Sequence, residues 1–414
     1  MLKNLFKDSA AIERLRREPY GPFLDSWAES LLDDGYAHST VRLYLRVITE
    51  FSRWAALGGL SICDLDESVV GAFAEVRHRE GCLHPRYRAA VTRLLEHLRA
   101  EGVVATPKPV ARETPAVQLV GRYEGYLRVE RGLAPVTVKD YRAFVHSFLA
   151  ELFGDAALRL GELGPADLSR FILRHAPSMS RGRAKLMSTA LRSFLRFLFQ
   201  RGEIEADLAA CVPSVPNWRL SGIPKYLGVE EVEALLGACD RRTGTGRRDY
   251  AILLLLARLG LRAGEVVALE LDDIDWRAGE LTVPGKGLRR DRLPLFADVG
   301  EALAVYLRRD RLPSLTRRVF VRRRAPHRGF AGPSTVGTIV RRALERAGLD
   351  PPGKGAHLLR HSLATGMLRS GASMAEIAEV LRHRAPTTTE IYAKVDLDGL
   401  RSLAQPWPVT GGGR

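Results

Sequence analysis

The chain has 414 residues, of which 46% are hydrophobic and 27% are charged, as in ordinary globular proteins. Basic residues exceed acidic ones by 15, and 54 of the 63 basic residues are arginine. The longest apolar run, residues 250–257, is far shorter than the roughly 18 residues of a membrane helix. The N-terminal residues lack the apolar segment of a signal peptide. We therefore expect a cytoplasmic protein with a phosphate-rich partner and no membrane association, because guanidinium groups bind phosphate oxygens in pairs.

Cysteine usage agrees with an intracellular location. The chain has four cysteines, far apart and without the paired spacing of a zinc site: Cys63, Cys82, Cys211 and Cys239. We expect reduced thiols and no bound metal.

Two proline-containing stretches, residues 104–117 and 212–224, interrupt the helical pattern. They divide the chain into an N-terminal block (1–105), a middle block (116–211) and a C-terminal block (225–396), followed by a tail (397–414). In the tail, leucines recur at three-residue spacing, which suits packing either on a neighbouring protomer or on the same chain.

The first two blocks resemble each other at an offset of 97 to 100 residues. Both carry apolar residues at i, i+3, i+4 and i+7, the stripe of an amphipathic helix. Any two helical bundles share such stripes, but the matching spacing favours a duplication. The matched pairs include Thr40 and Thr137, Val41 and Val138, Tyr44 and Tyr141, Phe51 and Phe148, Leu94 and Phe194, and Leu98 and Leu198. Each block is predicted to be a small helical bundle.

The C-terminal block is predicted to be mostly helical, with one small antiparallel sheet. Short β-type runs at 274–276, 280–283 and 292–295 are separated by glycine and proline turns. Helical patterns cover the segments 230–239, 248–259, 299–309, 334–347, 357–370, 374–382 and 390–395. Residues 373–376 and 387–390 have the spacing of N-terminal capping boxes. The whole chain is thus predicted to be mainly α-helical with a small antiparallel β-sheet.

Six residues of the C-terminal block suit one anionic phosphodiester. His357 and Arg360 lie three residues apart, hence on one helix face. The other four are Arg262, after a Gly-Leu break, Lys286 at a glycine-flanked turn, His383 at a helix end, and Tyr392. No carboxylate cluster with metal-ligand spacing accompanies them, which argues against a metal-dependent nuclease.

These residues stand in motifs that resemble the catalytic domain of tyrosine recombinases, the phage integrases. The motifs are Gly-Leu-Arg262-Ala-Gly-Glu265, Lys286 in its turn, His357-Leu-Leu-Arg360-His-Ser-Leu-Ala-Thr, Leu-Arg-His383 and Thr-Thr-Glu-Ile-Tyr392-Ala. The middle block resembles that family's helical core-binding domain, and the N-terminal block resembles a second copy of it. One departure is Arg382, because the family usually has glycine before this histidine.

A tyrosine hydroxyl is a poor nucleophile at neutral pH, so its attack on a phosphodiester needs charge stabilisation and proton transfer. Arg262 and Arg360 are expected to clamp the non-bridging oxygens, with a further hydrogen bond from His383. His357 is placed to assist proton transfer from Tyr392. The resemblance implies that Lys286 protonates the leaving 5′-oxygen, that Tyr392 becomes linked to the 3′-phosphate, and that Glu265 supports the site.

The resemblance further implies a homotetramer that exchanges strands between two DNA duplexes, without metal or cofactor. The alternatives are a type IB topoisomerase and a non-catalytic DNA-binding regulator with the same fold. The additional N-terminal block favours a recombinase that integrates, excises or transposes a mobile element. The predicted phosphate-binding residues of the two bundles are Arg42, Arg46, Lys139, Arg142, Arg181, Arg183, Lys185 and Arg192. No element carries a readable base code, so the target sequence cannot be predicted.

Overall fold

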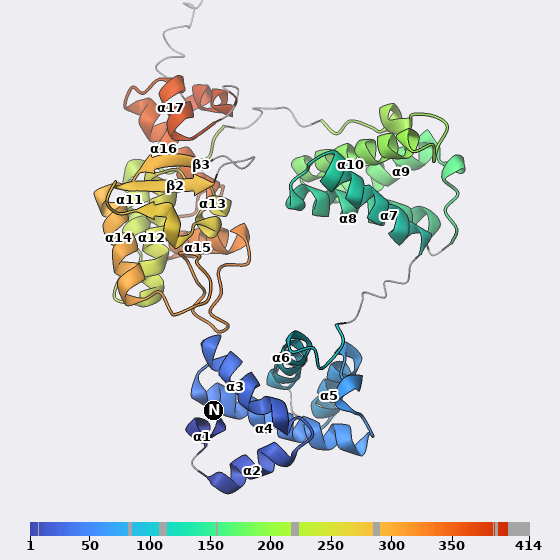
Figure 1. Ribbon diagram of the computed structural model, residues 1–414. Coiled ribbons are helices and arrows are strands. Elements are labelled where there is room, and N and C mark those ends of the chain that lie inside the picture. Colours follow the sequence, from blue (N-terminus) through green and yellow to red (C-terminus); the bar gives the residue numbers. More distant parts are fainter. Residues whose placement is uncertain are drawn as a thin grey trace, which may run out of the picture. The chain divides into compact units, whose positions relative to one another are not determined.

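The computed structural model describes residues 1–6, 8–81, 85–106, 114–154, 156–216, 223–284, 290–383, 385 and 388–395. These residues form helices and one three-stranded antiparallel sheet (Figure 1), which confirms the predicted fold class. Within the described residues, no helix combines the length and the apolar character needed to cross a membrane.

The N-terminal bundle is built on a core of large aromatic residues. Trp27, Phe51 and Phe73 are each at most 1% exposed, and the rings of Phe51 and Phe73 meet edge to face at 5.2 Å. Asp66 begins one of the helices by accepting hydrogen bonds from two backbone N–H groups. The helices are α1 (Leu2–Leu5), α2 (Ser9–Arg17), α3 (Leu24–Asp33), α4 (His38–Leu57), α5 (Glu67–Arg79) and α6 (Arg86–Ala100).

The middle bundle has its own aromatic core, in which Tyr123, Phe148 and Phe194 are fully buried. Its helices are α7 (Pro115–Gly125), continued by a π-helical turn (Tyr126–Glu130), then α8 (Pro135–Phe153), α9 (Pro165–His175) and α10 (Arg181–Gln200). Proline begins α7, α8 and α9 at a position where a missing backbone N–H costs no hydrogen bond.

The apolar residues matched between the two blocks are buried in both bundles. Val41, Tyr44 and Phe51 face the core from α4, as Val138, Tyr141 and Phe148 do from α8. Leu94 and Leu98 of α6 correspond in the same way to Phe194 and Leu198 of α10. The repeated stripe is therefore a repeated core-facing surface.

The C-terminal domain is organised around helix α12 (Gly244–Arg258), whose second half is buried on all sides. Residues 251–256 are each at most 1% exposed, as their unbroken apolar sequence predicts. The other helices are α11 (Val229–Gly237), α13 (Ala263–Ala268), α14 (Ala297–Arg309), α15 (Pro333–Arg346), α16 (His357–Arg369), α17 (Met374–Val380) and the 3-10 helix η9 (Glu390–Val395).

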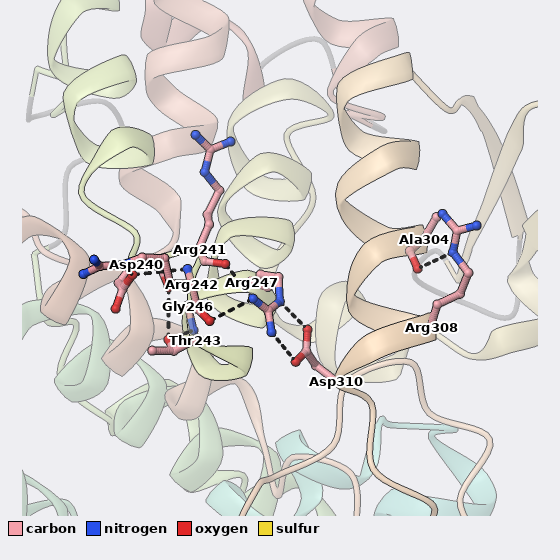
Figure 2. Close-up of polar contacts among 9 residues, drawn as sticks. All are labelled: Asp240, Arg241, Arg242, Thr243, Gly246, Arg247, Ala304, Arg308 and Asp310. Atoms are coloured by element: carbon pink, nitrogen blue, oxygen red, sulfur yellow. Dashed lines mark hydrogen bonds and ion pairs between the residues drawn. The ribbon is translucent and has the colours of Figure 1, made fainter.

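Helix α12 begins four residues before the predicted start because a polar cap holds its first turn. The Thr243 hydroxyl accepts a hydrogen bond from the Gly246 backbone N–H at 3.1 Å. Arg247 then makes a bidentate ion pair with Asp310, just after α14. Its Nε and Nη2 lie 2.6 and 2.7 Å from the two carboxylate oxygens (Figure 2). This pair ties the start of α12 to the end of α14.

The sheet has the order β1 (Ile274–Asp275), β2 (Glu280–Pro284) and β3 (Arg290–Pro294). Leu281 and Val283 of β2 are buried, and Leu281 pairs with Leu293 of β3. The three predicted strands are thus confirmed, with bounds that differ by one or two residues. The β2–β3 turn that contains Lys286 lies outside the described residues.

Some details of the prediction are wrong. The helix predicted for residues 374–382 ends at Val380, because Arg382 has a left-handed φ of +54° that no α-helix accommodates. Helix α13 follows a capping box at Arg262 and Glu265 that the sequence pattern did not predict. The Ser373 box is confirmed. Thr387 and the tail 397–414 lie outside the described residues.

Candidate active site

Arg262 is fixed at the N-terminus of α13 by Glu265. One Glu265 carboxylate oxygen accepts from the Arg262 backbone N–H at 2.8 Å, and the other accepts from Nη1 at 2.7 Å. Gly260 makes the preceding turn with a φ of +57°, and a Cβ there would lie 2.8 Å from Leu381. The turn at Gly260 and the buried Glu265 carboxylate together fix the position of the Arg262 side chain, which remains 40% exposed.

Arg360 lies beneath the same turn, in the first turn of α16. It is 4% exposed, and its guanidinium donates to the backbone carbonyls of Gly260 and Leu381. Burial, with the nearby charge of Arg262, lowers its pKa to about 10, so that it still carries its charge at neutral pH. Two arginines from distant segments therefore meet around one turn, as the sequence predicts for a phosphate clamp.

Tyr392, on η9, is 1% exposed, and its hydroxyl group contacts a histidine. Its hydroxyl lies 2.8 Å from Nδ1 of His361. Burial raises the pKa of Tyr392 to about 12, which Arg360 partly offsets. Burial and the charges of His357 and Arg360 lower the pKa of His361 to about 4. At neutral pH the imidazole is uncharged, and in its Nε2–H tautomer Nδ1 accepts a hydrogen bond from the tyrosine hydroxyl.

Two further histidines flank this pair. The His357 ring lies 6.4 Å from that of His361 on the same helix, and burial lowers the pKa of His357. The His383 ring lies parallel to Tyr392 at 6.5 Å, and its Nδ1 lies 2.9 Å from the Thr389 hydroxyl. Burial and the charge of Arg360 lower the pKa of His383 to about 4.

The structure brings together five of the six predicted catalytic residues: Arg262, His357, Arg360, His383 and Tyr392. The sixth, Lys286, lies outside the described residues, between the ends of β2 and β3. Glu265, predicted as a supporting residue, contacts Arg262 through both carboxylate oxygens. Sequence reasoning gave no role to His361, although this residue lies four positions after His357 and hence on the same helix face.

Arg382 adds a third guanidinium to the site. Its side chain is 8% exposed and donates from Nη2 to Glu265 at 2.7 Å. Its Nε lies 3.9 Å from Asp291 of β3. Burial lowers the pKa of Arg382, while Glu265 opposes the shift. Arg382 departs from the glycine usual at this place, and its backbone adopts the left-handed conformation that glycine favours.

The predicted phosphate-binding residues of the two bundles lie on three helices, α4, α8 and α10. All but Arg192 are exposed. Arg192 instead donates from Nη2 to the Val212 carbonyl and the Ser214 hydroxyl at 2.8 and 2.9 Å, which ties it within its own bundle. Arg142 pairs with Glu124 at 3.1 Å.

Comparison with known families gives three matches in this chain. The model of the "Phage integrase family" matches residues 225–398. The model of the "Phage integrase, N-terminal SAM-like domain" matches twice, at residues 24–102 and 120–202.

Curated relatives match over most of the chain. The putative integrase/recombinase y4rA of Sinorhizobium fredii is 48% identical, over 95% of this chain and 97% of that protein. Tyrosine recombinase XerD of Mycobacterium tuberculosis is 34% identical, over 70% of this chain and 97% of that protein.

Two solved structures share the fold at low identity. XerH recombinase bound to a palindromic difH substrate has a TM-score of 0.54 at 20% identity, covering 70% of this chain and 85% of that one. A lambda integrase dimer bound to a COC′ core site has a TM-score of 0.52 at 18% identity, covering 72% and 99%.

Proposed function

Because this chain belongs to the phage integrase family of tyrosine recombinases, we propose that it cleaves and rejoins DNA through a covalent bond between Tyr392 and a 3′-phosphate. The observation that carries this proposal is the Tyr392 hydroxyl, held 2.8 Å from a neutral imidazole beside Arg360. A hydroxyl, a proton acceptor and a buried cation are the groups that phosphoryl transfer to tyrosine requires.

In the forward step, Tyr392 Oη attacks phosphorus and the bond from phosphorus to the 5′-oxygen breaks. The tyrosine proton passes to His361 Nδ1. His357, one helical turn earlier on α16, is the next proton acceptor. Arg262, Arg360 and His383 bind the non-bridging oxygens and stabilise the charge of the transition state. These assignments keep the predicted clamp but add His361 as the first proton acceptor.

Lys286 is proposed to give its proton to the leaving 5′-oxygen. The phosphotyrosine keeps the energy of the broken bond, so a 5′-hydroxyl from another strand can reverse the reaction without ATP. Joining to a different strand is what distinguishes recombination from relaxation of one duplex. We propose that four protomers carry out this strand exchange on two duplexes and thereby move a mobile element.

The N-terminal bundle is proposed to bind DNA as the middle bundle does. Arg42 and Arg46 are exposed on α4, as Lys139 and Arg142 are on the matched helix α8. The double match to the SAM-like domain supports the same role for both bundles.

A duplex nicked beside the scissile phosphate tests the function. Loss of the short fragment traps the covalent adduct, which a regulator cannot form. A second, labelled duplex then reports strand transfer, which a recombinase performs and a topoisomerase does not. Tyr392→Phe should abolish the adduct and leave DNA binding intact, whereas the control Tyr250→Phe should behave as the wild type. Adducts formed equally by Tyr392→Phe would refute the proposal.

A further inference from the structure

Arg382 is unusual in its backbone. It is the only non-glycine residue with a positive φ in the described part of the chain, at +54°. A left-handed conformation is sterically unfavourable for a residue with a Cβ atom. The turn itself therefore favours glycine, the residue usual in the family at this place. An arginine here is accommodated at a cost in backbone strain, which directs attention to the contacts of its side chain.

The side chain points inward, to the carboxylate that fixes Arg262. Glu265 Oε2 accepts from Arg382 Nη2 at 2.7 Å and from the Arg262 backbone N–H at 2.8 Å. Its other oxygen accepts from Arg262 Nη1 at 2.7 Å. One carboxylate, 8% exposed, thus serves two guanidinium groups from segments that lie far apart in the sequence, with Arg382 117 residues after Glu265.

The charge balance shows what the second guanidinium changes. Arg262 and Glu265 alone form a neutral pair, so the carboxylate would cancel most of the Arg262 charge. With Arg382 the group of three carries a net positive charge beside the place where Arg262 and Arg360 meet. Glu265 and Arg382 are each 8% exposed, so solvent screens the interaction between them only weakly.

Arg382 also reaches toward the hairpin that carries Lys286. Its Nε lies 3.9 Å from Asp291, at the start of β3. Its Nε and Nη1 are buried without a hydrogen-bond partner among the described residues. Buried donors without acceptors cost free energy. The guanidinium is therefore not held by a complete set of hydrogen bonds, and its main contribution here is its charge.

We propose that Arg382 is a positioning residue for phosphodiester cleavage: by neutralising Glu265, it leaves the charge of Arg262 available to the scissile phosphate. The inference rests on the proposed function. Arg382 acts through Glu265 and does not itself contact the reacting atoms.

Single-turnover cleavage of the nicked duplex tests this role. Arg382→Gln should slow adduct formation about tenfold to a hundredfold, the range for losing a hydrogen bond between charged groups. The Kd for DNA should stay within about threefold. Arg382→Lys should restore most of the rate, and Arg382→Gly, which fits the left-handed turn, should fold normally yet cleave as slowly as the glutamine variant. The control Arg317→Gln removes an exposed ion pair with Asp272 in the same domain and should have no effect.

Two readouts separate charge balance from simple structural support. On a duplex with a neutral methylphosphonate at the scissile position, Arg382→Gln and the wild type should cleave at similar rates. In a Glu265→Gln background, Arg382→Gln should cause no further loss, because no carboxylate charge remains to neutralise. The inference would be overturned if Arg382→Gly cleaved at the wild-type rate. It would also be overturned if Arg382→Gln were equally slowed on the charged and the neutral substrate. Absence of any Tyr392-dependent adduct in the wild type would instead refute the proposed function.

Discussion

The contact between His361 and Tyr392 leads to a quantitative prediction. His361→Gln keeps a side chain that can accept the tyrosine hydrogen bond but cannot take its proton. General-base catalysis by a positioned group contributes about 10²–10⁴-fold. We therefore expect cleavage to slow by this factor, which corresponds to about 3 to 5 kcal/mol of activation free energy.

The two pKa values explain why the base is needed at the moment of attack. Burial raises the pKa of Tyr392 to about 12 and lowers that of His361 to about 4. Proton transfer before attack is therefore strongly unfavourable. The pair is therefore neutral at rest, and the proton moves only as the bond to phosphorus forms and the hydroxyl becomes acidic.

Single-turnover cleavage of the nicked duplex between pH 5 and 8 is the assay. The wild-type rate should be nearly independent of pH in this range, because His361 is already uncharged. His357→Gln is the matched variant, one helical turn earlier, and should lose less than His361→Gln. A larger loss for His357→Gln would refute the reasoning and make His357 the direct acceptor.

Three further predictions concern the leaving group, acid stability and DNA binding. Lys286→Ala should strongly slow cleavage of an ordinary duplex but cleave a 5′-bridging phosphorothiolate at nearly the normal rate, because sulfur leaves without a proton; equal loss on both substrates would remove the acid role. His361 and His383 have folded pKa values of about 4, below the unfolded value of about 6.5. Their stability contribution is complete above pH 6.5 and lost as the pH falls toward 4. Thermal unfolding should show a falling Tm across this window, less steep in His361→Gln, and parallel curves would contradict this origin. The double substitution of Arg42 and Arg46 by alanine should lower the salt-dependence slope of DNA binding by about 0.9 for each phosphate that the variant no longer neutralises. An unchanged slope would indicate that the N-terminal bundle contacts protein instead.

The sequence was sufficient where the signal is local. The unbroken apolar run of α12 predicts its burial, glycine and proline turns predict the three strands, and Ser373 with Glu376 predicts the start of α17. In each case the pattern and the physical cause lie within a few residues of each other.

Contacts between distant segments were beyond the same reasoning. The sequence marks Arg382 as a departure from glycine, but its carboxylate partner lies 117 residues earlier. The motif around Arg360 includes His361, yet only the fold brings Tyr392, 31 residues later, to its Nδ1. Similarly, the sequence gives no sign that Arg192 is held by the backbone of Val212.

Identification of the residue bonded to DNA tests the central claim most directly. The wild-type protein is trapped on the nicked duplex and digested with protease and nuclease, and the nucleotide-linked peptide is sequenced by mass spectrometry. The account predicts a single peptide that carries a 3′-phosphate on the oxygen of Tyr392. A nucleotide on any other side chain, or no linked peptide from a strand-transfer-competent preparation, would contradict it.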